Sequence, residues 1–280
     1  VVYDANSFSG DGGASLFKMW RSGKNDDTGE YTIGYAGPAP VVLPDTTTYH
    51  PIEGRRRFET AVEASKEAFP NGAATVVVAT GRNWPDALGG SALAGAYECP
   101  ILLVDTNEIP ASVADEIGRL KATRAIVLGG TDAVGEDVAV ELARMRLTVT
   151  DEFQFPGEDF TAQMIAKAVT DKLGAAYDGT ALAATGTNFP DALAASPLAY
   201  AKGWPIYLVR PVEGAPADVM ASNDVTDVLV LGGDAAVSAA HGAALADAFG
   251  GTHVDRLEGR TRYETAVEIA NYGVDDAGLA

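Results

Sequence analysis

The densest cluster of positive charge in the sequence is a run of three arginines, and a second arginine pair repeats it near the end. Arg55, Arg56 and Arg57 are consecutive, and Arg260 and Arg262 stand in a matching Glu-Gly-Arg segment 205 positions later (260 − 55). A guanidinium group binds the oxygens of a carboxylate or a phosphate through two parallel hydrogen bonds, so these residues are candidates for holding an anion. The alternative is that they form a solvated helix start or pair with acids of a neighbouring part of the chain.

A short loop with polar side chains occurs twice. It reads Thr-Gly-Arg-Asn-Trp-Pro-Asp-Ala-Leu from residue 80 and Thr-Gly-Thr-Asn-Phe-Pro-Asp-Ala-Leu from residue 185. The amides of Asn83 and Asn188 can bond a sugar hydroxyl or a phosphate, beside an aromatic ring that forms an apolar wall. Each loop follows a predicted strand and begins a helix, where free backbone amides favour an anion. In the alternative interpretation, Asp86 and Asp191 cap their own helices and the aromatic rings belong to the core.

The sequence contains few of the residue combinations that are typical of catalytic sites. Its single cysteine precedes a predicted buried strand without an obvious histidine partner, its three histidines are far apart, and no Gly-x-Ser-x-Gly segment is present. The glycine pairs at 129–130 and 232–233 lack the spacing of nucleotide-binding loops and are typical of tight turns. Asp86 and Asp191 suggest the acid pair of a glycosidase, but one aspartate per copy fits multivalent binding better. We therefore expect no catalytic residue, no metal site and no cofactor.

Composition limits the partners further. The 280 residues are 47% hydrophobic and 21% charged, which is typical of a folded globular protein. Their net charge of −19 disfavours binding to nucleic acids and to anionic membrane surfaces. No apolar run approaches the roughly 18 residues of a membrane span, so we expect no membrane insertion. The chain opens at Val1 without a recognisable signal peptide, and we expect it to be a piece of a longer polypeptide.

Other segments of the chain repeat at the same spacing. Pro-Ile-Leu-Leu-Val at residue 100 returns as Pro-Ile-Tyr-Leu-Val at residue 205, and Val-Leu-Gly-Gly at residue 127 returns at residue 230. The offsets of 105 (205 − 100) and 103 (230 − 127) match that of the polar loops, 185 − 80. Units of about 100 residues are large enough for each to have a core of its own. The expected parts are 1–49, the tail of an upstream β-rich module plus a linker; 50–150, repeat one; 151–255, repeat two; and 256–280, the start of repeat three.

Within each repeat the pattern predicts strands and helices in alternation. The run Thr75–Ala79 is continuous and rich in β-branched residues, as a strand buried on both faces requires. Further elements of repeat one are expected at 85–94, 101–104, 110–120, 125–128 and 135–145. Single helices between short apolar strands imply right-handed crossovers. We therefore predict an α/β protein of tandem three-layer α/β/α units with mostly parallel sheets, in which Thr75–Ala79 and Thr180–Ala184 take equivalent places. A short β-rich segment, with a strand at Thr32–Tyr35, is expected to precede them.

Several of these motifs, in this order, resemble the cell wall binding repeat 2 family, whose tandem repeats occur in surface proteins of Gram-positive bacteria. They are Gly-Arg-x-Arg-Tyr-Glu-Thr-Ala, Gly-x-Asn-Phe-Pro-Asp-Ala-Leu-Ala, Pro-Ile-Leu-Leu and Val-x-Leu-Gly-Gly, spread over residues 50–280. The resemblance implies a secreted, non-catalytic module that anchors its protein non-covalently to an anionic cell wall polysaccharide or teichoic-acid-like polymer. It also implies three units packed around a pseudo-threefold axis, with the polymer near the clefts between units. On this interpretation the polymer-binding residues are Arg55, Arg57, Asn83, Asp86, Asn188, Asp191, Arg260 and Arg262.

Repeat two departs from the family pattern at its start. Aligned on the Thr-Ala pair, Phe-Pro-Gly-Glu-Asp-Phe-Thr-Ala from residue 155 has two residues fewer between Gly and Thr than the other repeats, and no arginine. If that arginine contacts the polymer, the site of repeat two is degraded. Two other functions fit the sequence: an α/β enzyme that acts on a sugar or nucleotide-sugar through the Asn/Asp loops, and a self-assembling surface-layer protein.

Overall fold

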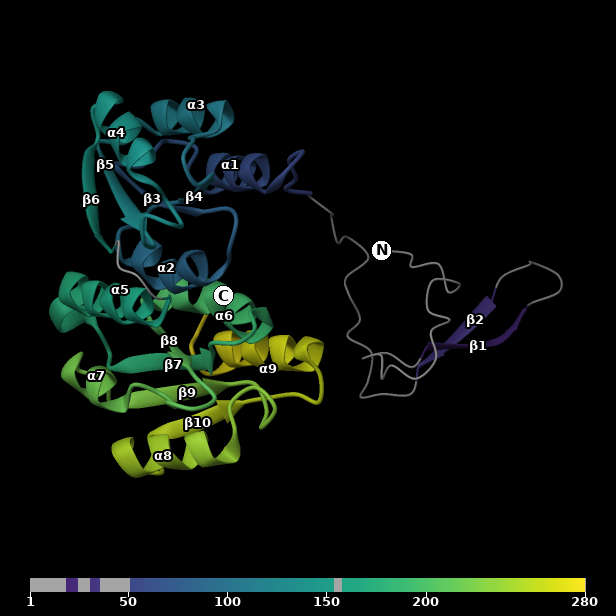
Figure 1. The fold of residues 1–280 in the computed structure, drawn as a ribbon. Coiled ribbons are helices and arrows are strands. Elements are labelled where there is room, and N and C mark those ends of the chain that lie inside the picture. Colours follow the sequence, from purple (N-terminus) through teal and green to yellow (C-terminus); the bar gives the residue numbers. More distant parts are fainter. Residues whose placement is uncertain (1–18, 25–30, 36–50, 154–157, 280) are drawn as a thin grey trace. The chain divides into compact units, whose positions relative to one another are not determined.

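A computed structural model describes residues 19–24, 31–35, 51–153 and 158–279 of the chain. The chain divides into two compact units, Val1–Pro51 and Ile52–Ala280. In the first unit, β1 (Met19–Lys24) and β2 (Tyr31–Tyr35) pair in antiparallel fashion (Figure 1). This hairpin confirms the predicted short β-rich segment, and the rest of the expected N-terminal tail lies outside the described residues.

The second unit, which we call the body, alternates helices and strands (Figure 1). Its elements are α1 (Arg57–Ala68), β3 (Thr75–Thr80), α2 (Pro85–Ala96), β4 (Ile101–Val104), α3 (Ala111–Leu120), β5 (Arg124–Leu128), α4 (Glu136–Arg144), β6 (Thr148–Phe153), α5 (Glu158–Leu173), the 3₁₀ turn η2 (Gly174–Ala176), β7 (Thr180–Thr185), α6 (Pro190–Lys202), β8 (Ile206–Val209), α7 (Ala217–Ser222), β9 (Asp227–Leu231), α8 (Ala239–Phe249), β10 (Val254–Leu257) and α9 (Arg262–Asp275). The strands and helices that the sequence predicts for repeat one are all present, with ends that differ by at most two residues.

Two four-stranded sheets form the framework of the body. The first sheet has the order β4-β3-β5-β6 and the second the order β8-β7-β9-β10, and every pairing within them is parallel. The central strands β3 and β7 hold equivalent places, as the repeated sequence predicts. The tandem α/β architecture is therefore confirmed. Because all strands of a sheet run the same way, their carboxyl ends meet at one edge, where ligands of such sheets bind.

The two sheets share part of their core. Val76 and Val78 of β3 pack beneath α1, α3 and α4, whereas Val77 and Ala79 face the other sheet. Alternate side chains of a strand point to opposite faces, which explains why β3 needs an uninterrupted apolar run. Figure 1 shows α2, α5, α6 and α9 in the layer between the sheets. The expectation of a separate core for each repeat is thus wrong in part, because this middle layer belongs to one common core.

Small residues allow the middle layer to pack closely. Helices α2 and α6, which carry the repeated Pro-Asp-Ala-Leu start, pack against each other. At Gly95 an added Cβ atom would clash with the backbone oxygen of Tyr200, so glycine is required where the two helices approach most closely. The expected packing role of the small residues in these helices is consistent with this contact.

Each sheet ends in an edge strand that the sequence pattern does not predict. The strands β6 and β10 read Thr-Val-Thr-Asp-Glu-Phe and Val-Asp-Arg-Leu, and neither contains a continuous apolar run. An edge strand has one neighbouring strand and can form without such a run, although the edge strands on the other side of each sheet, β4 and β8, have one. The predicted boundary between residues 150 and 151 consequently falls inside β6.

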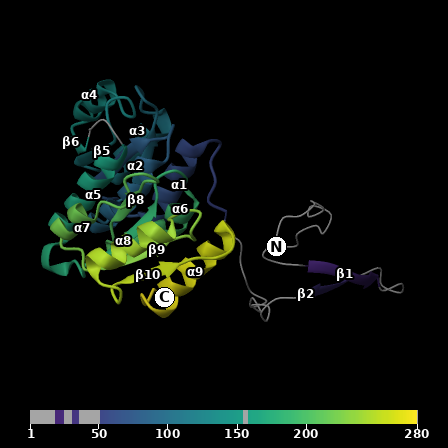
Figure 2. The same cartoon turned by 60° about the horizontal axis from the view of Figure 1, so that its bottom comes forward.

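Helix α9 follows β10 and docks on the second sheet's side of the body (Figure 2). Ile269 is buried in the common core next to α6, whereas Val267, on another face of the helix, is 48% exposed. The sequence alone left open whether this segment docks or frays. The burial of Ile269 shows that it docks.

Candidate binding cleft

A cavity of about 280 Å³ lies at the carboxyl edge of the second sheet. Its walls are the loop between β7 and α6, the turn after β9, and the chain between β10 and α9. The lining residues are Thr185, Thr187, Asn188, Pro190 and Asp191; Gly233, Ala235 and Ala236; and Gly259, Arg260, Thr261, Arg262 and Thr265. Four predicted site residues therefore meet here, Asn188, Asp191, Arg260 and Arg262. We call this cavity the α6/α9 cleft.

Local hydrogen bonds fix the loop before α6. Asn188 Oδ1 accepts from the backbone N–H of Phe189 at 2.9 Å, and the hydroxyl oxygens of Thr185 and Thr187 lie 2.9 Å apart. Phe189 occupies the capping position of the helix. The alternative in which Asp191 caps its own helix is therefore wrong, and the same holds for Asp86, because Trp84 occupies the capping position of α2.

Asp191 lies instead against the turn after β9. It is only 8% exposed, and an added Cβ atom at Gly232 would clash with its Oδ2. Gly232 has a φ of +87°, which confirms that this glycine pair forms a tight turn. Burial raises the pKa of Asp191, and the nearby charge of Arg262 opposes that rise. The cleft thus contains one acid whose charge is partly compensated.

The segments before α9 and before α1 are stabilised by equivalent hydrogen bonds. The backbone N–H of Gly259 donates to Thr265 Oγ1 at 3.0 Å, and the backbone N–H of Gly54 donates to Thr60 Oγ1 at the same distance. The two threonines therefore have a structural role, as expected. Thr261 caps α9 by accepting from a backbone N–H one turn into the helix.

The two arginines of the cleft differ in their partners. Arg260 is 83% exposed in its side chain and pairs with Glu264 at 2.9 Å. The Arg262 side chain is also exposed, and within the described part of the chain it has no hydrogen-bonded or ion-paired partner. Arg262 is therefore the cleft arginine with no hydrogen-bonded or ion-paired partner in the described chain, although its charge also acts on the buried Asp191.

The polar loop of the first sheet lies beside that of the second. Asn83 Oδ1 accepts from the backbone N–H of Trp84 at 3.0 Å, which repeats the bond at Asn188, and Asp86 is buried as Asp191 is. The rings of Trp84 and Phe189 are 6.1 Å apart between centroids. Since Phe189 is 41% exposed, its ring is not part of the core, contrary to the alternative interpretation.

The first loop carries a different arrangement of charge. Arg82, which stands where the second loop has Thr187, pairs with Asp105, with 2.8 Å between Nε and Oδ1. Residues 154–157, which occupy the place of the segment before α9, lie outside the described residues. The counterpart of the α6/α9 cleft at the first sheet is therefore described on two sides only.

The arginines before α1 lie at the first sheet. Arg57 donates a hydrogen bond to the backbone oxygen of Gly81 in the first polar loop, and both Arg55 and Arg57 are exposed. Glu59 corresponds to Glu264 of the other segment, but in the described chain its buried Oε2 has no hydrogen-bond partner. Arg57 thus contacts the first polar loop while it remains exposed, as Arg55 does.

Other kinds of site find no support in the described residues. That part of the chain contains no group of three or more His, Cys, Asp or Glu side chains that could hold a metal ion. None of its helices is long and apolar enough to cross a membrane. Burial raises the pKa of Cys99 to about 12, so the thiol stays protonated at neutral pH and is a poor nucleophile.

Comparison with known families decides where the chain belongs. The family model of cell wall binding domain 2 (CWB2) matches residues 52–139 and 160–241. The chain is a member of the CWB2 family. The two matches contain both polar loops and the segment before α1, and they leave Arg260 and Arg262 outside.

Two curated relatives from Bacillus subtilis (strain 168) are similar to most of this CWB2 chain. The N-acetylmuramoyl-L-alanine amidase LytC is 25% identical over 232 residues, which make up 82% of this chain and 44% of the relative. The amidase enhancer is 26% identical over 221 residues, or 77% of this chain and 28% of the relative. The chain therefore spans less than half the length of either relative.

Two solved structures from Clostridium difficile share the fold of the CWB2 chain. Cwp6 has a TM-score of 0.70 at 23% identity and covers 90% of this chain with 38% of its own. Cwp8 has a TM-score of 0.69 at 25% identity and covers 79% of this chain with 37% of its own. The likeness to Cwp6 is evidence for the fold alone.

Sequence reasoning missed several walls of the α6/α9 cleft. Thr185 and Thr187 belong to the repeated loop, and Gly233 belongs to the repeated glycine pair, so a signal for each was present. What the sequence could not supply is the fact that the loop, the turn and the start of α9 meet at one sheet edge. That requires the fourth strand, β10.

Proposed function

We propose that this CWB2 chain is a non-catalytic module that anchors its protein to the cell wall by holding an anionic wall polymer non-covalently in the α6/α9 cleft. The observation that carries the proposal is that two helix starts and two arginines converge on one cavity. The first amides of a helix have no partner within the helix, and its dipole is positive there, so each start attracts an anion. The ligand groups would be the phosphates or carboxylates of a wall polysaccharide or teichoic-acid-like polymer.

The positive charge in the cleft supports this proposal, although the chain as a whole is negative. With a net charge of −19 the protein repels polyanions at long range. Screening at physiological salt limits that repulsion to about 8–10 Å, so a nearby cation dominates at contact distance. Arg262 is such a cation, although the buried Asp191 offsets part of its charge. Arg260 adds to it, although Glu264 shares its charge.

The remaining predicted residues fit further contacts along the same polymer. Asn188 uses its Oδ1 within the loop, so its amide hydrogens can donate to a sugar or phosphate oxygen. Asp191 can accept a sugar hydroxyl at the cleft. Asn83 and Asp86 would act similarly at the first loop, and Arg55 and Arg57 would serve the first sheet. In this proposal the protein is secreted and resides at the cell wall, with its repeats packed against each other.

An enzyme that acts on a sugar or nucleotide-sugar is the second candidate. The amidase activity in the name of LytC belongs to that relative, of which this chain covers 44%. Asp86 and Asp191 occupy equivalent buried places in two copies of one loop, which is an arrangement suited to repeated binding. An acid–base pair needs two carboxylates in different environments. We therefore favour binding without turnover.

Cosedimentation with purified sacculi tests the proposal. The protein is expected to sediment with intact sacculi and to stay in the supernatant after the anionic polymer has been stripped by acid, because the peptidoglycan left behind lacks the dense anionic groups. Raising the salt concentration should release the protein from intact sacculi. Equal sedimentation with stripped sacculi would contradict binding through an anionic polymer, and release of soluble glycan would favour the enzyme.

A further inference from the structure

Arg256 bridges the two ends of the turn after β9. It lies on β10, where its residue pairs with Val230 of β9. Its Nη1 donates to the backbone oxygen of Gly232 at 2.6 Å and to that of Val237 at 3.0 Å. Its Nη2 lies 3.9 Å from Asp234 Oδ1, and the side chain is only 22% exposed. One guanidinium group therefore ties the segment Gly232–Val237 to the neighbouring strand.

This turn is the middle wall of the α6/α9 cleft. Gly233 and Ala235 line the cavity, whereas Arg256 does not. The backbone N–H groups of Ala236 and Val237 are used inside the turn, where both donate to the oxygen of Gly233. For the N–H groups of Gly233 and Ala235, the described residues provide no acceptor. Two residues that line the cleft thus have backbone N–H groups without an acceptor in the described chain, and Arg256 holds their turn without lining the cavity.

The guanidinium of Arg256 also lies close to helix α8. Gly242 of α8 lies so near that an added Cβ atom would be 2.8 Å from Nη2. The strand that carries Arg256 leads within four residues to Arg260, and then to Arg262. The same side chain therefore couples two of the three walls of the cleft, because its strand continues into one wall and its guanidinium holds another.

The first sheet anchors its corresponding turn differently. Ala133 and Val134 donate to the oxygen of Gly130, as in the second sheet, but Gly135 N–H donates at 2.6 Å to the oxygen of Thr106, which follows β4. The strand β6 contains Asp and Glu and no arginine. An arginine that holds the turn from the neighbouring edge strand is thus a feature of the second sheet in the described body.

We propose that Arg256 is a positioning residue of the α6/α9 cleft. It holds the Gly232–Val237 turn in place so that the amides of Gly233 and Ala235 face the same anionic group as Arg262. This inference rests on the proposed function of the cleft. Arg256 acts through the turn and makes no contact with the polymer.

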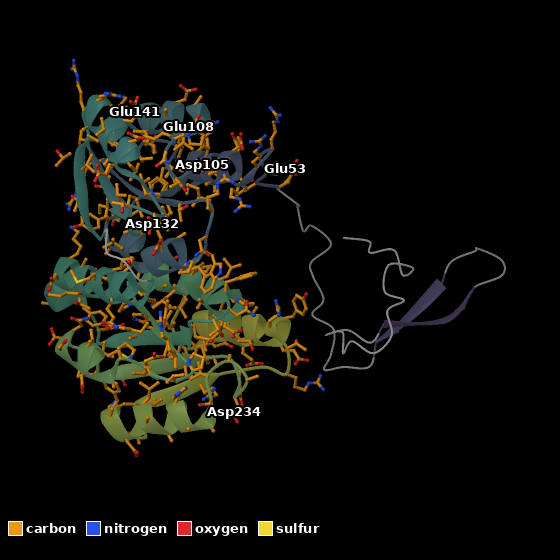
Figure 3. The ribbon with its side chains drawn as sticks, viewed as in Figure 1. Glu53, Asp105, Glu108, Asp132, Glu141 and Asp234 are labelled. Carbon is orange, nitrogen blue, oxygen red and sulfur yellow. The ribbon has the colours of Figure 1, made fainter. Side chains whose placement is uncertain are left out.

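The test compares Arg256→Met with Arg144→Met, using polymer released from sacculi as the probe. Arg144 is an exposed arginine on α4 that pairs with Glu141 at 3.2 Å, so both variants lose one positive charge. Figure 3 places Glu141 and Asp234 at opposite ends of the body, which keeps the control away from the cleft. Arg256→Met is expected to bind roughly tenfold more weakly, because the loss of two hydrogen bonds frees the turn. Arg144→Met should bind as the parent does.

Salt dependence separates positioning from direct contact. Each cation that pairs with a polyanion adds to the slope of log affinity against log salt concentration. Arg256→Met should leave this slope unchanged while lowering the affinity, whereas Arg262→Gln should lower both. A reduced slope for Arg256→Met would overturn the positioning role in favour of direct contact.

A second variant covers the case in which Arg256→Met does not fold. Gly242→Ala suits the helix and keeps every charge, but its Cβ would push the guanidinium away from the turn. We expect it to bind at least threefold more weakly than the parent with a thermal midpoint close to that of the parent. If the parent binds the polymer and Gly242→Ala or a folded Arg256→Met binds equally well, the inference is wrong while the proposed function stands. If the parent does not bind, both fail.

Discussion

Replacing Arg262 with glutamate is expected to reduce retention on sacculi more than tenfold. The change removes an attraction and adds a repulsion at the side chain that is free to meet an anion in the cleft. At about 4 Å, one such charge pair is worth ~1 kcal/mol in water and ~4 kcal/mol near a protein surface. A loss of about 1.4 kcal/mol already corresponds to a factor of ten in affinity. The measurement is the fraction of protein that cosediments over a series of sacculus concentrations.

This substitution can be separated from unfolding and from bulk charge. Arg262 is the first residue of α9, where an acid is favourable for the helix, but the change also removes the positive charge beside the buried Asp191; the thermal midpoint of the variant is therefore measured together with its retention. Arg144→Glu makes the same change of charge on α4 and serves as the control. Arg260→Glu should have a smaller effect than Arg262→Glu, because Glu264 already shares the charge of Arg260. Equal losses in Arg262→Glu and Arg144→Glu would mean that only the overall charge matters.

Extending the chain by one further sheet is expected to strengthen wall retention by a factor of about 100 or more. On α9, an apolar face containing Tyr263, Val267 and Val274 is exposed. The corresponding residues of α1 and its C-cap, Phe58, Val62 and Phe69, pack against the core of the first sheet. A copy of residues 70–153 attached after Val274 would therefore offer α9 a matching surface. Linked sites exceed single-site affinity by ~10²–10⁴ when they bind one polymer together.

The extension has its own control and its own contrary outcome. Val267→Asp in the extended chain should prevent docking of the added sheet, because it places a charge in the new interface. Retention should then fall back toward that of the parent chain. If the added sheet folds, buries Val267 as judged by hydrogen exchange, and retention is still unchanged, two sheets are sufficient for wall binding.

The fold could be predicted because the motifs of the core strands occur in both repeats. The β-branched run of β3 and its counterpart β7 are buried on both faces, and such strands cannot be mistaken for surface segments. The edge strands β6 and β10 were not predicted by the same reasoning because their sequences mix polar and apolar residues. The common core escaped it too, since close contact at Gly95 depends on the path of a second helix.

The candidate site could be predicted only where a motif repeats. Asn188, Asp191, Arg260 and Arg262 come from two motifs far apart in sequence, and the structure brings them to one cleft. Arg256 belongs to none of the repeated motifs. Its role depends on two backbone oxygens that only the folded chain brings within hydrogen-bonding distance of its guanidinium. The burial of Asp191 could not be foreseen either, because it follows from the space left by Gly232.

The central claim is that the anionic polymer binds in the α6/α9 cleft, and amide chemical-shift mapping tests it most directly. Polymer released from sacculi would be titrated into ¹⁵N-labelled protein, and the shifts of assigned backbone amides followed. The account predicts the largest saturable shifts at Gly233, Ala235 and Arg262, with weaker shifts at the first polar loop and none on α4. Saturable binding whose shifts lie elsewhere in the body, with the amides of Gly233 and Arg262 unmoved, would contradict it.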